Sequence, residues 1–291
     1  MSALAHGRTH AVVVTLALSA SALGCREAPA LPQNQEASAR ASSTSRPPKT
    51  VSIATYNVFY GNAEKKDGPP ETWADAATLQ AARELASADV IAFQETNPAW
   101  AAALSGALAS THPHCVFHDP VRYLPGGLGI CAKAPIVEDR LIDSPVGWFP
   151  AESAIIELEG IRIRLVNVHL RPAVANVAEW WQTNKATRAE RATEIRAYLA
   201  SAGGPLDLLV GDYNDITGSD LFAELAAAGM DSAFALKPSG KATWRWAGTD
   251  LQAELDHVAF SKSRFRLVDI RVVRAGQSDH DPVIATLEGA I

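Results

Sequence analysis

The sequence predicts an α/β fold in which two packed β-sheets are flanked by helices. Segments with the alternating apolar pattern of strands are numerous, whereas segments with helical periodicity are few. The stretch Glu159–Ile161 has the character of a hairpin turn, so the strands on either side of it are expected to be antiparallel. A chain with this balance of elements buries its apolar faces best by stacking two sheets and covering them with helices.

The expected elements follow one another from about residue 50 to the end of the chain. The helix expected at 185–201 carries Ala192, Ile195 and Leu199 on one apolar stripe, and its charged residues, including Arg191 and Glu194, are expected mostly outside that stripe. The strands are expected at 50–58, 89–95, 114–118, 127–132, 152–159, 161–170, 206–213, 242–246, 254–261, 267–273 and 282–288, and the helices at 71–87, 97–108, 185–201 and 219–228.

Residues 1–25 have the pattern of a secretory signal peptide. Arg8 precedes an apolar run at 11–24, which is too short for a comfortable membrane span. Cys25, directly after Gly24, resembles a bacterial lipoprotein processing site, with Ala22 where a large aliphatic residue is usual. We therefore expect export from a bacterial cytoplasm as a periplasmic or cell-envelope lipoprotein. Plain secretion after cleavage nearby is the alternative.

Residues 26–48 are rich in Ala, Ser, Pro and Gln without periodicity, which is typical of a disordered tether. The remaining residues, 49–291, suit one large domain with a full core. After residue 50 the chain has 21 basic and 30 acidic residues, a formal charge of −9. Because an electrostatic grip on nucleic acid needs a basic face, this balance argues against tight non-specific DNA binding, although a bound metal supplies positive charge locally.

Three cysteines are present in the chain. If Cys25 is lipidated, Cys115 and Cys131 remain in an oxidising compartment, in segments expected to form neighbouring strands. A disulfide between them and a pair of buried free thiols both agree with the sequence.

Polar side chains continue the apolar faces of several expected strands. In residues 205–215, PLDLLVGDYND, the face of Leu206, Leu208 and Val210 continues to Asp212 and Asn214. Because a buried carboxylate is costly unless it is paired or holds a metal, such strands are expected to run out into a cleft. The same continuation is expected at Asn57 after Val51–Thr55, at Glu95 after Ile91 and Phe93, and at Asn167 and His169 after Ile161–Leu165.

The motifs TYNV, FQET, NVHL, GDYND, ELDHV and SDHDPV, in this order, resemble those of the endonuclease/exonuclease/phosphatase superfamily. This group includes DNase I, the exonuclease III-type AP endonucleases, neutral sphingomyelinases and inositol-polyphosphate 5-phosphatases. The resemblance covers essentially all of the chain after the tether. It implies a DNase I-like four-layer α/β sandwich, with two mixed sheets face to face, helices outside, and an active site where strand ends converge.

The resemblance also implies a metal-dependent phosphoesterase that uses Mg²⁺, with Mn²⁺ as a substitute. Asn57 and Glu95 match the positions that hold the metal, and Asp279 matches the metal-proximal aspartate. His169 matches the residue that contacts the scissile phosphate or helps the leaving oxygen. No carboxylate is evident that would support His169, as one supports the first histidine in DNase-like members.

The remaining implied catalytic positions lie in the GDYND, ELDHV and SDHDPV motifs. Asp212 and Asn214 match the pair that orients the attacking water and the phosphate, and His280 matches the general base. Asp256 matches the aspartate that hydrogen-bonds this histidine and fixes its tautomer. His280 begins the stretch HDPVIATLE and is expected to share a strand face with Ile284. If this strand and that of Asp256 are neighbours, the carboxylate can hold one imidazole nitrogen of His280.

The implied reaction is in-line hydrolysis of a phosphate ester, with a diester preferred over a monoester. Nucleic acid is the first-choice substrate, and a phospholipid or sphingomyelin headgroup is the second. A non-catalytic binding module on the same fold is the alternative from another class. Membrane contact is expected only through the lipid anchor, and no protein partner is implied.

Two further groups of residues carry no assigned role. Trp180 and Trp181 are the best candidates for substrate contact, although packing is the commoner fate of tryptophan. A histidine-rich stretch is expected on a loop or strand surface more readily than at a second metal site; it comprises His112, His114, His118 and Asp119.

Overall fold

The computed structural model describes residues 49–60, 74–173, 176 and 178–289. The expected signal peptide and tether, and the first residues of the helix expected at 71–87, lie outside the described residues. Within the described ranges, no helix has both the length and the apolar character needed to cross a bilayer. The elements below belong to one structural unit, residues 46–291.

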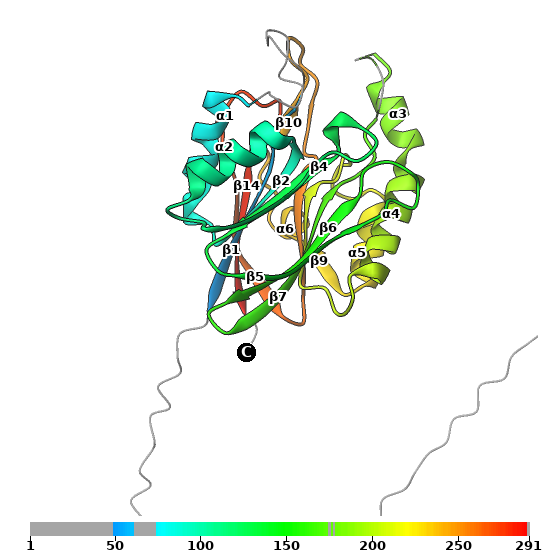
Figure 1. Ribbon diagram of the computed structural model, residues 1–291. Coiled ribbons are helices and arrows are strands. Elements are labelled where there is room, and N and C mark those ends of the chain that lie inside the picture. Colours follow the sequence, from blue (N-terminus) through cyan, green and yellow to red (C-terminus); the bar gives the residue numbers. More distant parts are fainter. Residues whose placement is uncertain (1–48, 61–73, 174–175, 177, 290–291) are drawn as a thin grey trace, which may run out of the picture. The chain divides into compact units, whose positions relative to one another are not determined.

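Two six-stranded sheets form the centre of this unit (Figure 1). The first has the strand order β13-β14-β1-β2-β4-β3, and the second has the order β5-β6-β7-β8-β12-β9. Both sheets are mixed, because β1 and β2 are parallel, as are β7 and β8, whereas the other pairs are antiparallel. The strands are β1 (Thr50–Asn57), β2 (Val90–Thr96), β3 (His114–His118), β4 (Gly127–Ala132), β5 (Ile136–Ile142), β6 (Ala151–Leu158), β7 (Ile161–His169), β8 (Leu208–Asp212), β9 (Met230–Ser232), β12 (Asp256–Ser261), β13 (Phe265–Val272) and β14 (Val283–Gly289), with a separate pair β10 (Trp244–Arg245) and β11 (Gln252–Ala253).

Helices cover the outer face of each sheet and complete four layers (Figure 1). One apolar cluster lies between the two sheets, a second lies between the first sheet and α1 and α2, and a third lies between the second sheet and α4 and α5. The predicted architecture is therefore confirmed. The helices are α1 (Ala76–Glu84), α2 (Pro98–Leu108), α3 (Trp180–Ala186), α4 (Arg188–Ser201), α5 (Asp220–Ala227) and α6 (Ala233–Leu236), with 3₁₀ turns η2 (Leu85–Ser87) and η3 (Leu124–Gly126).

Most of the expected elements are present, and those missed have weak patterns. Strand β5 is an edge strand with a largely solvent-exposed, charged sequence, so it lacks the apolar alternation of its neighbours. Strands β9 and β11 and helices α3 and α6 are too short to give a clear periodic signal. The expected hairpin turn is present between β6 and β7, where Glu159 and Gly160 both have positive φ.

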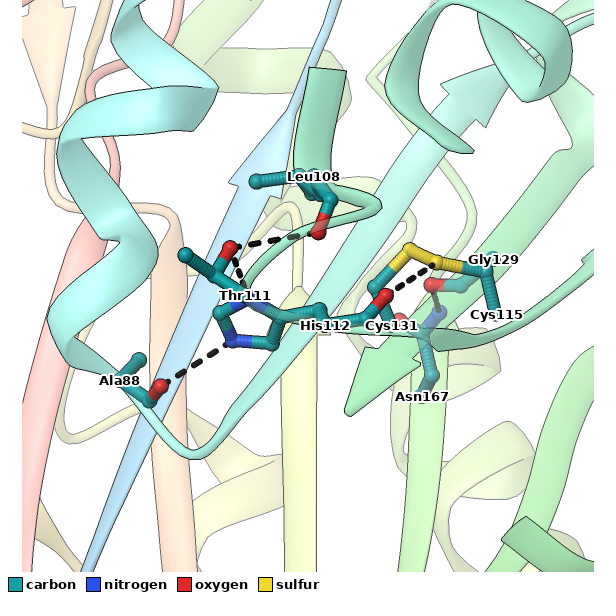
Figure 2. Close-up of a disulfide and its surroundings, with 8 residues drawn as sticks. All are labelled: Ala88, Leu108, Thr111, His112, Cys115, Gly129, Cys131 and Asn167. Atoms are coloured by element: carbon teal, nitrogen blue, oxygen red, sulfur yellow. Dashed lines mark hydrogen bonds between the residues drawn. A yellow bond between two sulfur atoms is a disulfide. The ribbon is translucent and has the colours of Figure 1, made fainter. Parts of the chain in front are cut away.

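A disulfide joins the two cysteines whose pairing the sequence leaves open. Cys115 and Cys131 are direct partners in the antiparallel pair of β3 and β4, and their sulfur atoms are bonded (Figure 2). The neighbouring His112 is buried and bonds the carbonyl of Ala88 through Nε2 at 3.1 Å. The bridge fastens the edge strand β3 to the sheet, and His112 belongs to the packing beneath α1.

Two charged residues of α4 that are expected outside its apolar stripe are fully buried. Arg191 pairs with Asp215, with 3.0 Å between Nε and Oδ2. Glu194 accepts hydrogen bonds from Ser144 Oγ and from the backbone amide of Arg171, each at 2.9 Å. The expectation from helical periodicity is wrong here, because the loops after β5, β7 and β8 bring polar partners to the buried face of α4.

The burial of Glu194 generates a prediction about stability. Burial raises the pKa of this carboxyl group to about 7, from an ordinary value of 4.5. Below pH 4.5 the group is protonated in both the folded and unfolded chain. Between pH 4.5 and 7 only the unfolded chain releases the proton, so the free energy of unfolding falls as the pH rises, by up to about 1.4 kcal/mol per pH unit.

We expect Glu194→Gln to flatten this part of the stability curve. Urea unfolding at pH 4.5, 5.5, 6.5 and 7.5 measures the slope, and Glu84→Gln, at an exposed glutamate of α1, is the control. An unchanged slope in Glu194→Gln, relative to the control, would contradict the assignment.

Candidate active site

Polar residues from both sheets meet at the end of the sandwich where β1 finishes, opposite the end at which the chain enters β1 in Figure 1. The parallel strands β1 and β2 end there at Asn57 and Thr96, and the parallel strands β7 and β8 end there at His169 and Asp212. Strand β12 begins at the same place, because Asp256 is the direct partner of Asp212 in an antiparallel pair. The sheet topology therefore accounts for the convergence that the sequence predicts.

Asn57 links the two sheets at the centre of this site. Its Nδ2 donates to Glu95 Oε1 at 3.0 Å and to Asp212 Oδ2 at 3.1 Å. Its Oδ1 accepts from the backbone amide of Phe59 at 2.9 Å. In this arrangement Asn57 positions two carboxylates as a hydrogen-bond donor, and a ligand role for its Oδ1 requires a rotation of the amide group.

Glu95 reaches the site by a route that simple alternation does not predict. Ile91 and Phe93 face α1 and α2, so the face that they define leads away from the space between the sheets. The register of β2 against β4 shifts between Gln94 and Thr96, and Glu95 has φ of 59°. The expected same-face continuation is wrong for this strand, and the β-bulge turns the Glu95 carboxylate toward Asn57.

His169 lies against the same carboxylates. Its Nε2 is 3.8 Å from Glu95 Oε1 and 3.5 Å from Asp212 Oδ2. Its Nδ1 is 3.1 Å from the carbonyl oxygen of Pro125, which can only accept, so Nδ1 carries the proton. Burial lowers the pKa of His169 to about 3, and the neutral ring therefore presents an unprotonated Nε2 to the site. A backbone carbonyl thus orients this histidine.

Asp256 and His280 form the hydrogen bond that the sequence predicts, although not between neighbouring strands. Nδ1 of His280 lies 2.8 Å from Asp256 Oδ2, and its Nε2 lies 3.6 Å from Asp212 Oδ2. The two strands are not neighbours, because β12 belongs to the second sheet while His280 precedes β14 of the first. Ile284 faces the helices, so it does not share the face of His280. The pair bridges the two sheets.

Asn214 lies beyond the end of β8, where a tight loop returns its side chain to Asp212. Its backbone amide donates to Asp212 Oδ1 at 2.8 Å, and its Nδ2 donates to the carbonyl of Leu170 at 3.0 Å. Asn214 has φ of 50°, an unfavourable value that neighbouring contacts must enforce. Asn184 supplies one of them, through Nδ2 to the carbonyl of Asn214 at 2.7 Å.

Asp215 anchors the same loop. Its side chain is buried against Arg191 of α4, and its backbone carbonyl accepts from His257 at 2.9 Å. His257 is fully buried on the face of β12 away from Asp256, where its ring contacts Tyr213 and Phe222. Arg191, Asn184 and Asp215 are the residues that sequence reasoning misses, because their spacing follows no period and only the fold brings them together.

Asp279 is held by an indole group. Trp244 Nε1 donates to Asp279 Oδ2 at 3.0 Å, whereas Asp279 Oδ1 is buried without a hydrogen-bond partner. Trp180 is buried and stacks on Trp244 with ring centroids 5.1 Å apart, so it is a packing residue rather than the exposed substrate contact expected for it. Trp181 is 51% exposed.

A run of aromatic rings leads from the surface to His169. Phe149 stacks on His169 with centroids 4.3 Å apart and meets Trp148 edge-on. Trp148 in turn stacks on Tyr123 at 4.9 Å, and Tyr123 is 44% exposed. The guanidinium of Arg171 lies 5.1 Å from the centre of the Trp148 ring. This side of the site offers flat apolar surface and one positive charge.

The site contains more buried negative charge than its own cations balance. Burial raises the pKa of Glu95, Asp212 and Asp279, that of Glu95 to about 8, and Asp279 adds to the effect on Glu95. In the described part of the chain, no lysine or arginine pairs with these three carboxylates, and histidines are the only ion-pair partners of Glu95 and Asp212.

A divalent cation fits this donor set. Glu95 and Asp279 supply carboxylate oxygens, the buried Oδ1 of Asp279 lacks a partner, and oxygen donors of this kind suit Mg²⁺ or Mn²⁺. Asp212, Asp256 and His280 also place one possible ligand atom each within 4.8 Å of one another, although His280 Nδ1 already bonds Asp256.

Comparison with known families assigns the chain. The model of the endonuclease/exonuclease/phosphatase family matches residues 54–280, a range that begins just before Asn57 and ends at His280. The chain belongs to this family. Its members are generally hydrolytic phosphoesterases, and the DNase I-like fold described above agrees with the match. None of the curated protein sequences compared with the chain matches it.

Solved structures of low sequence identity share the fold. An endonuclease/exonuclease/phosphatase from Beutenbergia cavernae is 17% identical, with a TM-score of 0.60 over 83% of this chain and 72% of that one. A humanized D. rerio TDP2 is 18% identical, with a TM-score of 0.57 over 82% and 98% of the two chains. Sphingomyelinase C from Streptomyces griseocarneus is 21% identical, with a TM-score of 0.55 over 84% and 100%.

The Asp256–His280 hydrogen bond generates a prediction about pH dependence. Burial lowers the pKa of His280, but Asp256 and Asp212 more than offset this effect and raise it well above its ordinary value. Removal of the Asp256 charge is therefore expected to shift the acid limb of the pH–rate profile to lower pH. Asp256→Asn is also expected to lower the maximal rate, because it no longer enforces the Nδ1–H tautomer.

Rates of wild type, Asp256→Asn, His280→Ala and the double variant, measured from pH 5 to 9, check this prediction. We expect a loss of about 10²- to 10⁴-fold in His280→Ala and little further loss in the double variant, because residues that act as a unit are not additive. Full additivity of the two single losses, or a wild-type profile for Asp256→Asn, would refute a joint role.

Proposed function

We propose that the chain is an exported, divalent-metal-dependent phosphodiester hydrolase whose first-choice substrate is nucleic acid. One observation carries the proposal: the residues matched to the family motifs lie together at one end of the sandwich, with Asp256 bonded to His280. A binding module that only retained the fold would have no need of this complete set. The set comprises Asn57, Glu95, His169, Asp212, Asn214, Asp256, Asp279 and His280.

The proposed reaction is in-line attack of water on phosphorus. His280 takes the proton of the water at Nε2, while Asp256 holds Nδ1 and stabilises the imidazolium that forms. Asp212, fixed by the amides of Asn57 and Asn214, orients the water. When bound at Glu95 and Asp279, the metal neutralises charge on the phosphate oxygens as a Lewis acid.

His169 is the proposed contact to the phosphate. Its neutral Nε2 faces Glu95 and Asp212, and stacking against Phe149 limits its rotation. Protonation of Nε2 as a phosphate approaches would give a donor aimed at an anionic oxygen, and the carboxylates would stabilise the charge. This role does not require His169 to be charged before the substrate binds.

The aromatic run supports a substrate with flat groups next to its phosphate. Trp148 and Tyr123 form a partly exposed stacked pair beside the site, and stacking on such rings is the sequence-tolerant way to hold single-stranded bases. A quaternary ammonium headgroup would also suit these rings, so a sphingomyelin or phospholipid diester is the second candidate. The structures that share the fold include D. rerio TDP2 complexed with a single-strand DNA product and a sphingomyelinase C.

We expect activity to require a divalent metal held by Glu95. Excess EDTA should abolish hydrolysis, Mg²⁺ or Mn²⁺ should restore it, and Glu95→Gln should raise the metal concentration needed for half-maximal rate by at least about tenfold. The substrates to compare are plasmid DNA, single-stranded DNA, RNA, sphingomyelin, bis-p-nitrophenyl phosphate and a monoester. Glu84→Gln, on α1, is the matched control.

Each outcome of this comparison is decisive. Hydrolysis that survives EDTA would refute the metal dependence, and preference for sphingomyelin or for the monoester would replace nucleic acid as the substrate. Metal binding without hydrolysis of any of these esters would favour a binding module.

The export part of the proposal rests on the N-terminal sequence. If Cys25 is the lipidated mature N-terminus, wild type should be found in the membrane fraction and Cys25→Ser should be released from it. Mass spectrometry of the mature N-terminus, together with fractionation of both forms, measures this. Soluble wild-type protein with another N-terminus would favour plain secretion.

A further inference from the structure

A second cluster of ionisable side chains lies where the open edges of the two sheets meet. Strand β3 is an edge of the first sheet and β5 is an edge of the second. His118 ends β3, Asp139 lies in β5, and Glu152 lies beside it in β6. Each side chain offers one potential ligand atom, and these three atoms lie within 4.8 Å of one another. Both sheets therefore contribute to one cluster.

The hydrogen bonds of this cluster leave two carboxylate oxygens without partners. His118 Nε2 lies 2.7 Å from Asp139 Oδ2 and 3.8 Å from Glu152 Oε1. Glu152 Oε2 accepts from Asn167 Nδ2 at 3.0 Å. When both groups are ionised, Glu152 Oε1 and Asp139 Oδ1 are buried with no hydrogen-bond donor, and the Glu152 side chain is fully buried. Burial raises the pKa of Glu152, and the charge of Asp139 and a hydrogen bond between the two carboxyl groups raise it further.

Among the described residues, His118 is the only possible ion-pair partner of these two carboxylates, and neither Asp139 nor Glu152 forms an ion pair with a lysine or an arginine. A buried carboxylate without a partner costs several kcal/mol, so the pair of free oxygens calls for either a proton or a cation. A bound cation would satisfy both oxygens at once.

We propose that His118, Asp139 and Glu152 form a binding site for a divalent transition-metal ion, separate from the candidate active site. One imidazole nitrogen and two carboxylate oxygens are a donor set typical of Zn²⁺, with water as the fourth ligand. Donor atoms around a tetrahedral ion of this size are about 3.4 Å apart, so small side-chain rotations bring these three into place.

The surroundings of the cluster suit such a site. The side chains of His118 and Asp139 are 23% and 16% exposed, which leaves a way in from solvent, whereas Glu152 is closed off. Asn167 holds the far oxygen of Glu152, as the partners of metal ligands commonly do. Asn167 also donates to the carbonyl of Gly129 in β4, close to the disulfide (Figure 2).

An ion at this place would fasten the two sheets together. Its ligands come from β3 of one sheet and from β5 and β6 of the other. Through Asn167 Oδ1, which accepts from Gln94 Nε2 at 2.7 Å, the cluster also contacts the residue next to Glu95. The ion would therefore stabilise the residues that pack beside the candidate active site, Asn167 and Gln94, without contacting the active-site residues themselves.

Binding of Zn²⁺ alone is the direct test. The background is Glu95→Gln/His280→Ala, which removes ligands of the candidate active site, with any affinity tag cleaved. We expect one Zn²⁺ per chain after equilibrium dialysis, and none after further His118→Ala or Glu152→Gln. His114→Ala, which removes another histidine of the same strand, should leave the stoichiometry at one.

Thermal unfolding gives an independent readout in the same Glu95→Gln/His280→Ala background. Zn²⁺ should raise the midpoint of this background and of its His114→Ala form, and should not raise that of its His118→Ala form. Circular dichroism of the metal-free forms shows whether each variant folds. Glu152→Gln imitates a protonated glutamic acid in shape, so it is the variant expected to keep the fold.

Two results would overturn the proposal. One is Zn²⁺ stoichiometry in the background that is unchanged by His118→Ala and by Glu152→Gln. The other is absence of bound Zn²⁺ in the background, and full stability of Glu152→Gln would then show that a proton shared between Asp139 and Glu152 satisfies the free oxygens.

Discussion

The burial of several carboxylates at the ends of strands is the constraint on which the rest of the site depends. Asp212 ends β8, Asp256 begins β12, and Glu95 lies one residue before the end of β2. The other side chains of these strands fill the core, so none of the three carboxylates can turn freely to water. The energetic cost of such burial is high. Amide groups, histidines and a bound cation are the three ways to offset it, and the surrounding sequence is arranged to supply them.

Backbone strain at two positions follows from the same constraint. Glu95 and Asn214 both have positive φ, which costs a non-glycine residue about 1–3 kcal/mol. Both residues present a polar group to the candidate active site. Gly211, just before Asp212, has φ of 138°, and a Cβ there would lie 1.9 Å from the carbonyl of Val168. The backbone is therefore in an unfavourable conformation near the end of β2, and only glycine fits at residue 211, where β8 lies against the backbone of β7.

The architecture and much of the site could be predicted because strand alternation is local. Asn57 and His169 lie on the faces that their apolar predecessors define, so a period of two suffices to place them. In β8 the prediction holds from Leu208, although Leu206 precedes the strand and packs under α4 and α5. The position of Glu95 depends on a bulge, and no periodic pattern records a bulge in advance.

Contacts between distant segments could not be predicted, because they depend on the packing of whole layers. The Asp256–His280 bond crosses from one sheet to the other, and the sequence gives no register for a contact of that kind. Arg191 and Glu194 are a sharper case. Their positions on α4 predict side chains exposed to solvent, yet both side chains are fully buried. Loops bring their polar partners to them, namely Asp215, Ser144 and the backbone of Arg171. The apolar periodicity of a helix predicts which of its faces packs on the sheet, but it does not predict which loops cover its other residues.

The net negative charge of the domain limits how an anionic substrate could be bound. With a formal charge of −9 after residue 50, long-range attraction of a polyanion is absent, and repulsion must be overcome at the site itself. Arg171, stacked over Trp148, is the positive group of the aromatic run, and its partner Glu190 offsets part of its charge. In the proposed reaction, attraction would therefore come from the proposed metal and from stacking on Trp148 and Tyr123. Both act over a few ångströms, so the arrangement favours a short substrate segment or an exposed end over a long duplex, whose many phosphates would meet an unfavourable field.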